Sequence, residues 1–145
     1  MSGRHNFDHT VNEGNIWLRK ISDRLHFEDS GHAYAALRST LHALRDRLSA
    51  QSAVHLSAQL PMVIRGLFFE GWRLTPSPSD DDTVDAFCGT VANNLPPKFP
   101  MDGKTVAEGV LEVLWREIDP GESAKIIDQL PPRLRVLWPR EARRA

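Results

Sequence analysis

Two histidines near the start of the chain have the spacing of metal ligands on a helix. His5 and His9 are four residues apart, so a helix would carry both imidazoles on one face. No third ligand is marked near them, and none of the six histidines pairs with a cysteine or a carboxylate at a recognised catalytic or ligand spacing. We therefore predict an ordinary N-terminal arm over residues 1–12, with no metal site and no cofactor.

The other reactive side chains do not form a catalytic pattern. Cys88 follows an apolar core position, which favours a buried or half-buried apolar side chain over a nucleophile. His42 and His55 are replaced by Glu112 and Lys125 in a second copy of the local pattern, so we predict that both histidines face solvent. The chain has no Gly-rich phosphate loop, no Gly-x-Ser-x-Gly elbow and no carboxylate dyad. An enzyme is the less favoured interpretation, and no catalytic residue is predicted.

Two arginines recur in matched surroundings. Arg65 and Arg135 each lie one turn after a Gln-Leu-Pro sequence, which begins at Gln59 in one case and at Gln129 in the other. Backbone groups at a helix break lack partners, and a glutamine amide can satisfy them. In the structural interpretation, each arginine bonds carbonyls or a carboxylate across the interface between two repeats. In the functional one, the two form a symmetric anion site, which needs both guanidinium groups on one surface.

These arginines belong to an internal duplication. Residues 55–68 and 125–138 share the Gln-Leu-Pro sequence, the arginine and a leucine seventy residues apart, and the flanking apolar positions recur in type. The shared register runs from about 13–68 against 83–138 without a gap. We predict one domain over residues 1–145, with repeat one at about 13–72, a connector at about 73–83 and repeat two at about 84–139.

The elements of the first repeat follow from the spacing of its apolar residues. Trp17, Ile21 and Leu25 recur every four residues, which predicts a helix over about 13–25. A second helix begins at the Asp29-Ser30 cap and runs to about residue 48, with four leucines inside and the charged side chains in solvent. The charged side chains are those of Arg38, Arg45, Asp46 and Arg47.

Two shorter helices complete the repeat. Ser49 is the expected N-cap of the third helix, and Pro61 ends that helix and begins the fourth. The fourth helix, about 61–72, is almost wholly apolar, so we expect it to fill the joint between the repeats. With the second copy, this predicts an all-α fold of about eight helices, arranged as two tandem four-helix repeats in one bundle with pseudo-twofold symmetry.

The connector between the repeats is rich in proline, serine and aspartate. Asp80–Asp82 could bind a divalent cation, but the run lacks the alternating oxygen ligands and the glycine of a calcium loop. We predict a solvated linker that ends in a helix cap.

Composition excludes several classes of protein. The 145 residues are 41% hydrophobic and 26% charged, with a net charge of -1, which is typical of a globular domain and gives no global attraction to nucleic acid or anionic membrane. One cysteine cannot form an internal disulfide, and the apolar runs are far shorter than a membrane span. We also find no leader sequence, so the expected location is cytoplasmic, without membrane contact.

Several short stretches of the chain together resemble a known family. They are Ala36-Leu37-Arg38, the stretch from Leu41 to Leu48, His55 to Pro61, Phe69-Glu70-Gly71-Trp72, Gly121-Glu122 and Gln129-Leu130-Pro131. The chain resembles a bacterial family of small helical proteins catalogued as domain of unknown function 2267, from Phe7 to Pro139. The resemblance implies an all-α fold in a bacterial, cytosolic setting, and it carries no established activity and no catalytic residues.

For function, the sequence favours a non-enzymatic interaction or adaptor domain whose partner is another protein. The expected interaction surface includes Phe69, Trp72, Arg133 and Arg140. Two alternatives stay open: binding of nucleic acid or an acidic partner by the C-terminal arginine cluster, and carriage of a small ligand in a pocket between the repeats. The cluster consists of Arg133, Arg135, Arg140, Arg143 and Arg144. The sequence does not decide the oligomeric state.

Overall fold

The structure is a computed structural model that describes residues 3–74 and 83–144. Within these ranges it is built of α-helices and 3-10 helices and has no strand, which confirms the predicted all-α class. The α-helices are α1 (Gly3–Leu25), α2 (Ser30–Arg45), α3 (Ala50–Ser57), α4 (Met62–Phe69), α5 (Val84–Asn94), α6 (Gly103–Glu117) and α7 (Pro120–Gln129). The 3-10 helices are η1 (Pro132–Leu137) and η2 (Arg140–Arg144).

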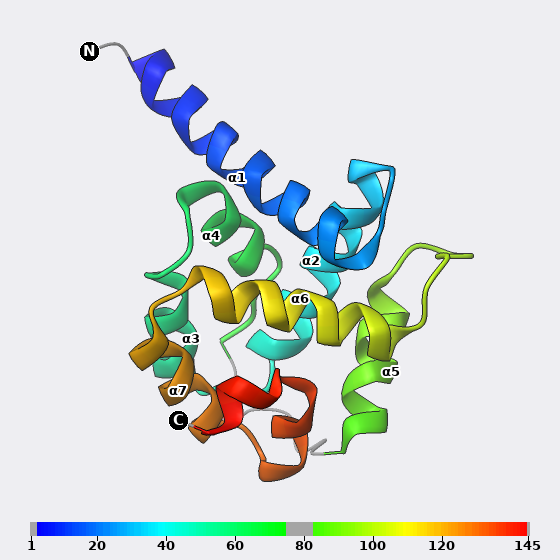
Figure 1. Ribbon diagram of the computed structural model, residues 1–145. Helices are drawn as coiled ribbons and strands as arrows, with labels where there is room; N and C mark the ends of the chain where they lie inside the picture. The colour runs from blue at the N-terminus through cyan, green and yellow to red at the C-terminus, as the bar shows by residue number, and fades with distance from the viewer. Residues whose placement is uncertain (1–2, 75–82, 145) are drawn as a thin grey trace.

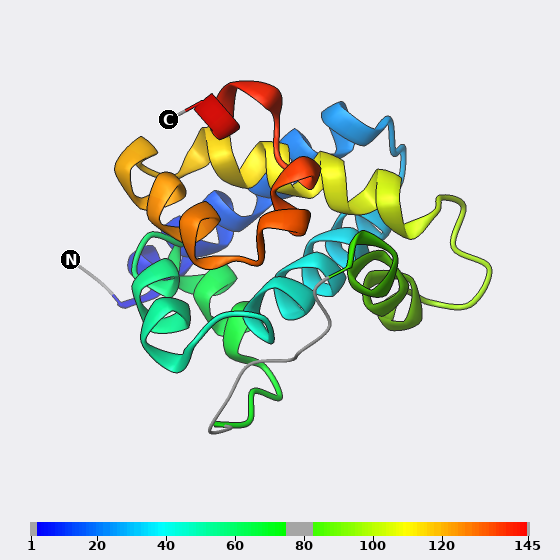
Figure 2. The same cartoon turned by 90° about the horizontal axis from the view of Figure 1, so that it is seen from below.

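Helices α2 and α6 form the centre of the bundle (Figure 1). Helix α2 contacts α1, α4, α5 and α6, and α6 contacts α1, α5, α7 and η1. Both helices bury apolar side chains on more than one face, and burial of each large one contributes about 1.5–3 kcal/mol. The view from below shows the C-terminal helices on the same side of the bundle as α6 (Figure 2). The two halves of the chain therefore share one core across α2 and α6.

Helix starts lie where the capping residues predict them. Ser49 accepts a hydrogen bond from the amide of Ser52 at the start of α3, and Asp119 accepts from the first amides of α7. Asp29 caps α2 in the same way. Pro61 and Pro131 directly precede α4 and η1. The paired starts keep the seventy-residue spacing, although the duplication and its symmetry stay predictions.

The N-terminal arm predicted over residues 1–12 is wrong for the part that the structure describes. Helix α1 begins at Gly3, and its first half extends beyond the body of the bundle (Figure 1). Phe7 and Val11 continue the apolar face that holds Gly14 and Leu18 in the body of the helix, at positions i, i+4, i+7 and i+11. The polar residues around them obscured this stripe in the sequence.

The central position predicted for α4 is also wrong. This helix packs on α1 and α2, which belong to its own half of the chain. Ile64 and Phe68 are its buried residues, whereas Met62 and Val63 are exposed. A helix of eight residues has room for one buried row at i and i+4, so the other apolar side chains point outward. The contacts of α2 with α5 and α6, and of α1 with α6, join the two halves instead.

Arg47, predicted to face solvent, is 4% exposed. Its guanidinium lies 4.9 Å from the centre of the Phe87 ring, and its Nη2 donates to Thr90 Oγ1 at 3.2 Å. The arginine therefore joins the end of α2 to α5 through a cation–π contact and a hydrogen bond. The predicted linker and cap at Asp80–Asp82 lie outside the described residues, and the N-cap of α5 is Thr83.

Candidate interaction surface

An apolar groove of about 470 Å³ lies between α1, α2 and α4. We call it the α1–α2–α4 groove. Its walls are mostly aliphatic, and Asn15 and Glu70 contribute an amide and a carboxylate to the lining. The lining residues are Val11, Gly14, Asn15, Leu18, Tyr34, Leu37, Val63, Ile64, Gly66, Leu67 and Glu70. The groove belongs wholly to the first half of the chain.

Gly14 sets the distance between α1 and α4. A Cβ atom on this residue would lie 2.6 Å from Cγ1 of Val63, closer than real Cβ contacts. The first amides of α4 also lack a side-chain cap from Pro61, and the amide of Val63 donates to Thr10 Oγ1 at 3.2 Å instead. Because Gly14 has no side chain, α4 can lie close to α1, and the hydrogen bond from Val63 to Thr10 holds the start of α4 there.

Helix α2 holds the other end of α4. His42 Nε2 lies 2.8 Å from the carbonyl oxygen of Leu67, and Arg45 Nη1 donates to the carbonyls of Phe68 and Glu70, each at 2.9 Å. Arg38 adds an ion pair with the Glu70 carboxylate at 2.7 Å. The last carbonyls of a helix have no partner inside it, so these side chains supply what α4 lacks.

His42 and Arg45 are both buried, with 7% of each exposed, so the solvent positions predicted for them are wrong. They share one face of α2 with Arg38, at positions i, i+4 and i+7, and this face meets the carbonyl end of α4. Burial is the main cause that lowers the pKa of His42, opposed by its hydrogen bond to Leu67. Arg45 and Arg38 lower the pKa further, which favours a neutral imidazole that donates from Nε2 to the Leu67 carbonyl.

Large apolar side chains are exposed along the rim of the groove. Val11 is 52%, Tyr34 46% and Val63 42% exposed, and they come from three different helices. Phe7 is exposed further toward the N-terminal end of α1, whereas the exposed Met62 at the start of α4 lines a separate hollow beside His5 and His9. Exposed apolar side chains that gather on one face indicate a binding surface, whereas scattered ones do not.

The repeated arginines cap the helix that precedes each of them. Arg65 donates from Nε to the carbonyl of Ser57 at 2.9 Å and from Nη2 to Leu60 at 3.1 Å. Arg135 donates from Nε to Ile127 at 3.2 Å and from Nη2 to Asp128 at 3.0 Å. Both bond carbonyls, as the structural interpretation expects, but within their own half of the chain and not across an interface. No observation favours an anion site here.

The predicted interaction residues do not line the groove. Phe69 and Trp72 are half-buried at the end of α4 with their ring centres 5.2 Å apart, and they pack against the core. Arg133 in η1 and Arg140 in η2 are exposed. Sequence reasoning missed the groove itself. The available signal was the apolar stripe that runs on through Phe7 and Val11.

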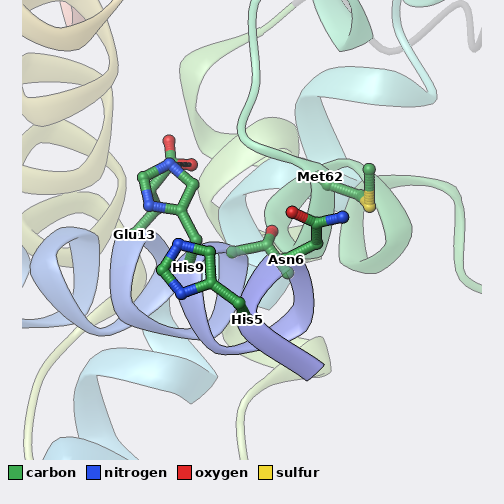
Figure 3. Close-up of a pocket in the computed structure, with 6 residues that line it drawn as sticks. His5, Asn6, His9, Glu13 and Met62 are labelled. Atoms are coloured by element: carbon green, nitrogen blue, oxygen red, sulfur yellow. Dashed lines mark ion pairs between the residues drawn. The ribbon is translucent and has the colours of Figure 1, made fainter. Parts of the chain in front are cut away.

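A second hollow, on the other side of α1, holds the two histidines singled out in the sequence (Figure 3). His5 and His9 point to the same side of the helix, as their spacing predicts, and His9 Nε2 lies 3.0 Å from Glu13 Oε1. Among residues 3–74 and 83–144, no three His, Cys, Asp or Glu side chains are placed to hold a metal ion together. Burial is the main cause that raises the pKa of the half-buried Cys88 thiol, which makes it a poorer nucleophile.

A hollow of about 410 Å³ also lies between α1 and α6, where the two halves meet. It is lined mainly by charged side chains that pair across it, Lys20 with Glu117 at 2.6 Å and Arg24 with Glu112 at 2.8 Å. This lining does not suit the apolar carrier pocket expected between the repeats. None of the described helices is both long and apolar enough to cross a membrane.

Comparison with known proteins gives a family and no activity. The model of one family, described as "Uncharacterized conserved protein (DUF2267)", matches residues 14–137, which include nearly all of the groove. The match begins at Gly14, after the extended first half of α1. No curated protein matches the chain. With most of its length matched, the chain belongs to the DUF2267 family of uncharacterized conserved proteins.

Proposed function

We propose that this protein is a non-enzymatic protein-interaction module and that its α1–α2–α4 groove binds an amphipathic helix. The observation that carries the proposal is the exposed apolar groove itself, with Val11, Tyr34 and Val63 on its rim. A helix that inserts apolar side chains at i, i+3 or i+4 and i+7 would cover this rim and remove it from water. Burial of such side chains is the main source of affinity in grooves of this kind.

The groove is held open by contacts that do not need a ligand. Helix α4 is fixed at its start by Thr10 and at its end by His42 and Arg45. A wall that is already in place loses little conformational freedom when the partner binds, which favours affinity. Glu70, at one end of the groove, offers a carboxylate next to the apolar floor and is paired with Arg38. This pair provides polar contacts at the rim, where they orient a partner.

The setting that we propose is the bacterial cytoplasm. The single cysteine, Cys88, is half-buried and unpaired, as expected in a reducing compartment. Binding of nucleic acid through the C-terminal arginines has less support. Arg135 already bonds two carbonyls, and Glu141 interrupts the exposed Arg133, Arg140 and Arg143.

Site-specific photo-cross-linking tests the proposal. Val11 on the groove is the test position and Val54 on α3 is its matched control, since both are helical valines and they are 52% and 51% exposed. With benzoylphenylalanine at position 11, irradiation in cells of the native host is expected to give a defined adduct with a polypeptide. The same probe at position 54 should give none. Equal labelling from both positions, or none from either, would remove the proposal.

A further inference from the structure

We infer that the occupant of the groove is a second copy of this chain: two α1 helices cross antiparallel, and each extended segment lies in the other copy's groove. The inference depends on the proposed function, because it names the partner of the same groove. Four observations on α1 lead to it. They are the extension of the helix, its apolar stripe, the position of the groove beside that stripe, and two charged residues that form no ion pair with any described residue.

The first two turns of α1, residues 3–9, are exposed to solvent at every position. This segment extends beyond the body of the bundle, and Phe7 within it is 68% exposed (Figure 1). A helical segment of this length is only marginally stable in water unless it packs against something. Its stripe is apolar and continuous with the groove wall, since Phe7 and Val11 lead into Gly14 and Leu18. The extension therefore has the amphipathic pattern that the groove would bind.

The exposed apolar stripe of the extended segment, which we call the ridge, and the α1–α2–α4 groove lie side by side on one face of α1. A twofold rotation can therefore place the ridge of each copy in the groove of the other, which closes the assembly at two copies. In the antiparallel arrangement, Phe7 comes within two residues, about 3 Å along the helix, of the level of Leu18 in the second copy. Leu18 and Tyr34 both line the groove there, and an aromatic pair of Phe7 with Tyr34 can form. A parallel arrangement would set the two extensions against each other and leave both grooves uncovered.

Charge selects the antiparallel register. Asp8 and Arg19 are exposed on the same side of α1, next to the apolar stripe, and neither forms an ion pair with any residue that the structure describes. Lys20 and Arg24, on the side toward α6, are both paired. With the crossing point between residues 13 and 14, Asp8 of each copy stands level with Arg19 of the other. Such pairs add little affinity but strongly discriminate between registers.

Asp8 and Arg19 cannot pair within one chain. They are eleven residues apart, which is about 16 Å along a helix at 1.5 Å per residue. An effect of one residue on the other must therefore pass between two chains. This separation allows a charge-swap experiment. Each single variant carries like charges at both contacts of its homodimer, and only the heterodimer of the two variants carries opposite charges there.

The experiment measures self-association by sedimentation equilibrium of the full chain. Wild type is expected to change from 16.3 kDa to twice that mass as concentration rises. Asp8→Arg and Arg19→Asp each turn both charge pairs into like-charge pairs, so each should weaken dimerisation about tenfold. An equimolar mixture of the two variants restores both pairs in the heterodimer, and its affinity should return to about that of wild type.

A second pair of variants tests the apolar contact. Val11→Asp is expected to weaken dimerisation by about a hundredfold, because it places a charge in the interface, while Val54→Asp on α3 should leave it unchanged. Circular dichroism of both variants checks that they keep the fold.

Three results would overturn the inference: wild type stays at the mass of one chain at all concentrations, the mixture binds no better than either variant, or Val11→Asp and Val54→Asp behave alike. If wild type is a monomer while the probe at position 11 still labels a different polypeptide, the self-association fails and the proposed interaction function stands. If neither association nor labelling occurs, both fail.

Discussion

Helix α4 and η1 begin with the same sequence signals and end in different surroundings. Each follows a Leu-Pro pair, and each carries an arginine that caps the preceding helix, Arg65 in one and Arg135 in the other. Helix α4 nevertheless leaves Met62 and Val63 exposed, with Val63 on the groove, whereas η1 has a second proline and an arginine at the matching positions. The Leu-Pro pair and the arginine therefore set the turn before each helix. Whether the surface of that helix is apolar differs with the helix that packs beside it.

That neighbour is α1 in the first half and α5 in the second. Helix α1 has 23 residues and α5 has 11, so α1 alone extends past the body of the bundle. Gly14 lets α1 approach α4 closely, and the position seventy residues later is the half-buried Val84. A long helix, a glycine and an apolar outward face occur together in the first half. Their combination forms a binding surface there, and the second half contributes mainly to the core.

The largest effect is expected from the buried arginine that holds the end of α4. Arg45→Met removes the donors to the buried carbonyl of Phe68 and the half-buried carbonyl of Glu70. We expect the free energy of unfolding to fall by about 2–3 kcal/mol. Urea denaturation measures it, with Arg116→Met on exposed α6 surface as the control. A loss no larger than that of the control would show that water replaces the guanidinium.

Placing the residue of the second half into the first should crowd the contact between α1 and α4 at Gly14. Gly14→Val puts side-chain atoms where Val63 already lies, so we expect a loss of about 1–3 kcal/mol in the free energy of unfolding. Gly89→Ala, in α5, is the comparison, because nothing lies within 4 Å of its added Cβ. That change should raise stability by about 0.5–1 kcal/mol through helix propensity. Equal shifts for both variants in thermal denaturation would mean that α1 and α4 are not tightly packed.

The two prolines allow a smaller comparison between the halves. Pro61→Ala frees a backbone that the ring holds at φ -55°, and it should lower stability by about 0.4–1 kcal/mol through the entropy of the unfolded chain. Pro131→Ala should cost less, because Pro132 still restricts the same turn. The midpoints of chemical denaturation of the two variants and of wild type measure this difference. An unchanged or higher midpoint for Pro61→Ala would show that the proline is only tolerated.

Sequence reasoning recovered what depends on neighbours along the chain. The cap at Ser49, the cap at Asp119 and the apolar stripes gave the helix starts and the fold class, because capping and periodicity are local. It misplaced Arg45 and Arg47, since charged side chains are usually exposed, and no local pattern reveals a carbonyl end or an aromatic ring brought in from another helix. The groove was missed for the same reason: its three helices meet only in the folded chain.

Of these predictions, the pH dependence that arises from His42 is the smallest, and its direction follows from the structure. Burial, Arg45 and Arg38 all disfavour the charged imidazole, and only the Leu67 carbonyl and Glu70 favour it, so the pKa of His42 in the folded protein lies below its ordinary value of 6.5. The unfolded chain then binds the proton more tightly than the folded one, and stability rises with pH in this window. The contribution is complete above pH 6.5 and is lost as pH falls through the lowered pKa.

His42→Gln keeps a donor for the Leu67 carbonyl and cannot titrate, so it should remove this step from a plot of unfolding free energy against pH. Protonation would leave the Nε2 hydrogen bond in place and add a buried charge between two arginines, so α4 should loosen at its end without loss of the whole fold. Hydrogen exchange of the α4 amides at pH 5 and pH 7 measures this loosening. Faster exchange at the lower pH in wild type but not in His42→Gln, after correction for intrinsic rates, is the expected result. Identical profiles for the two proteins would mean that His42 does not control the end of α4.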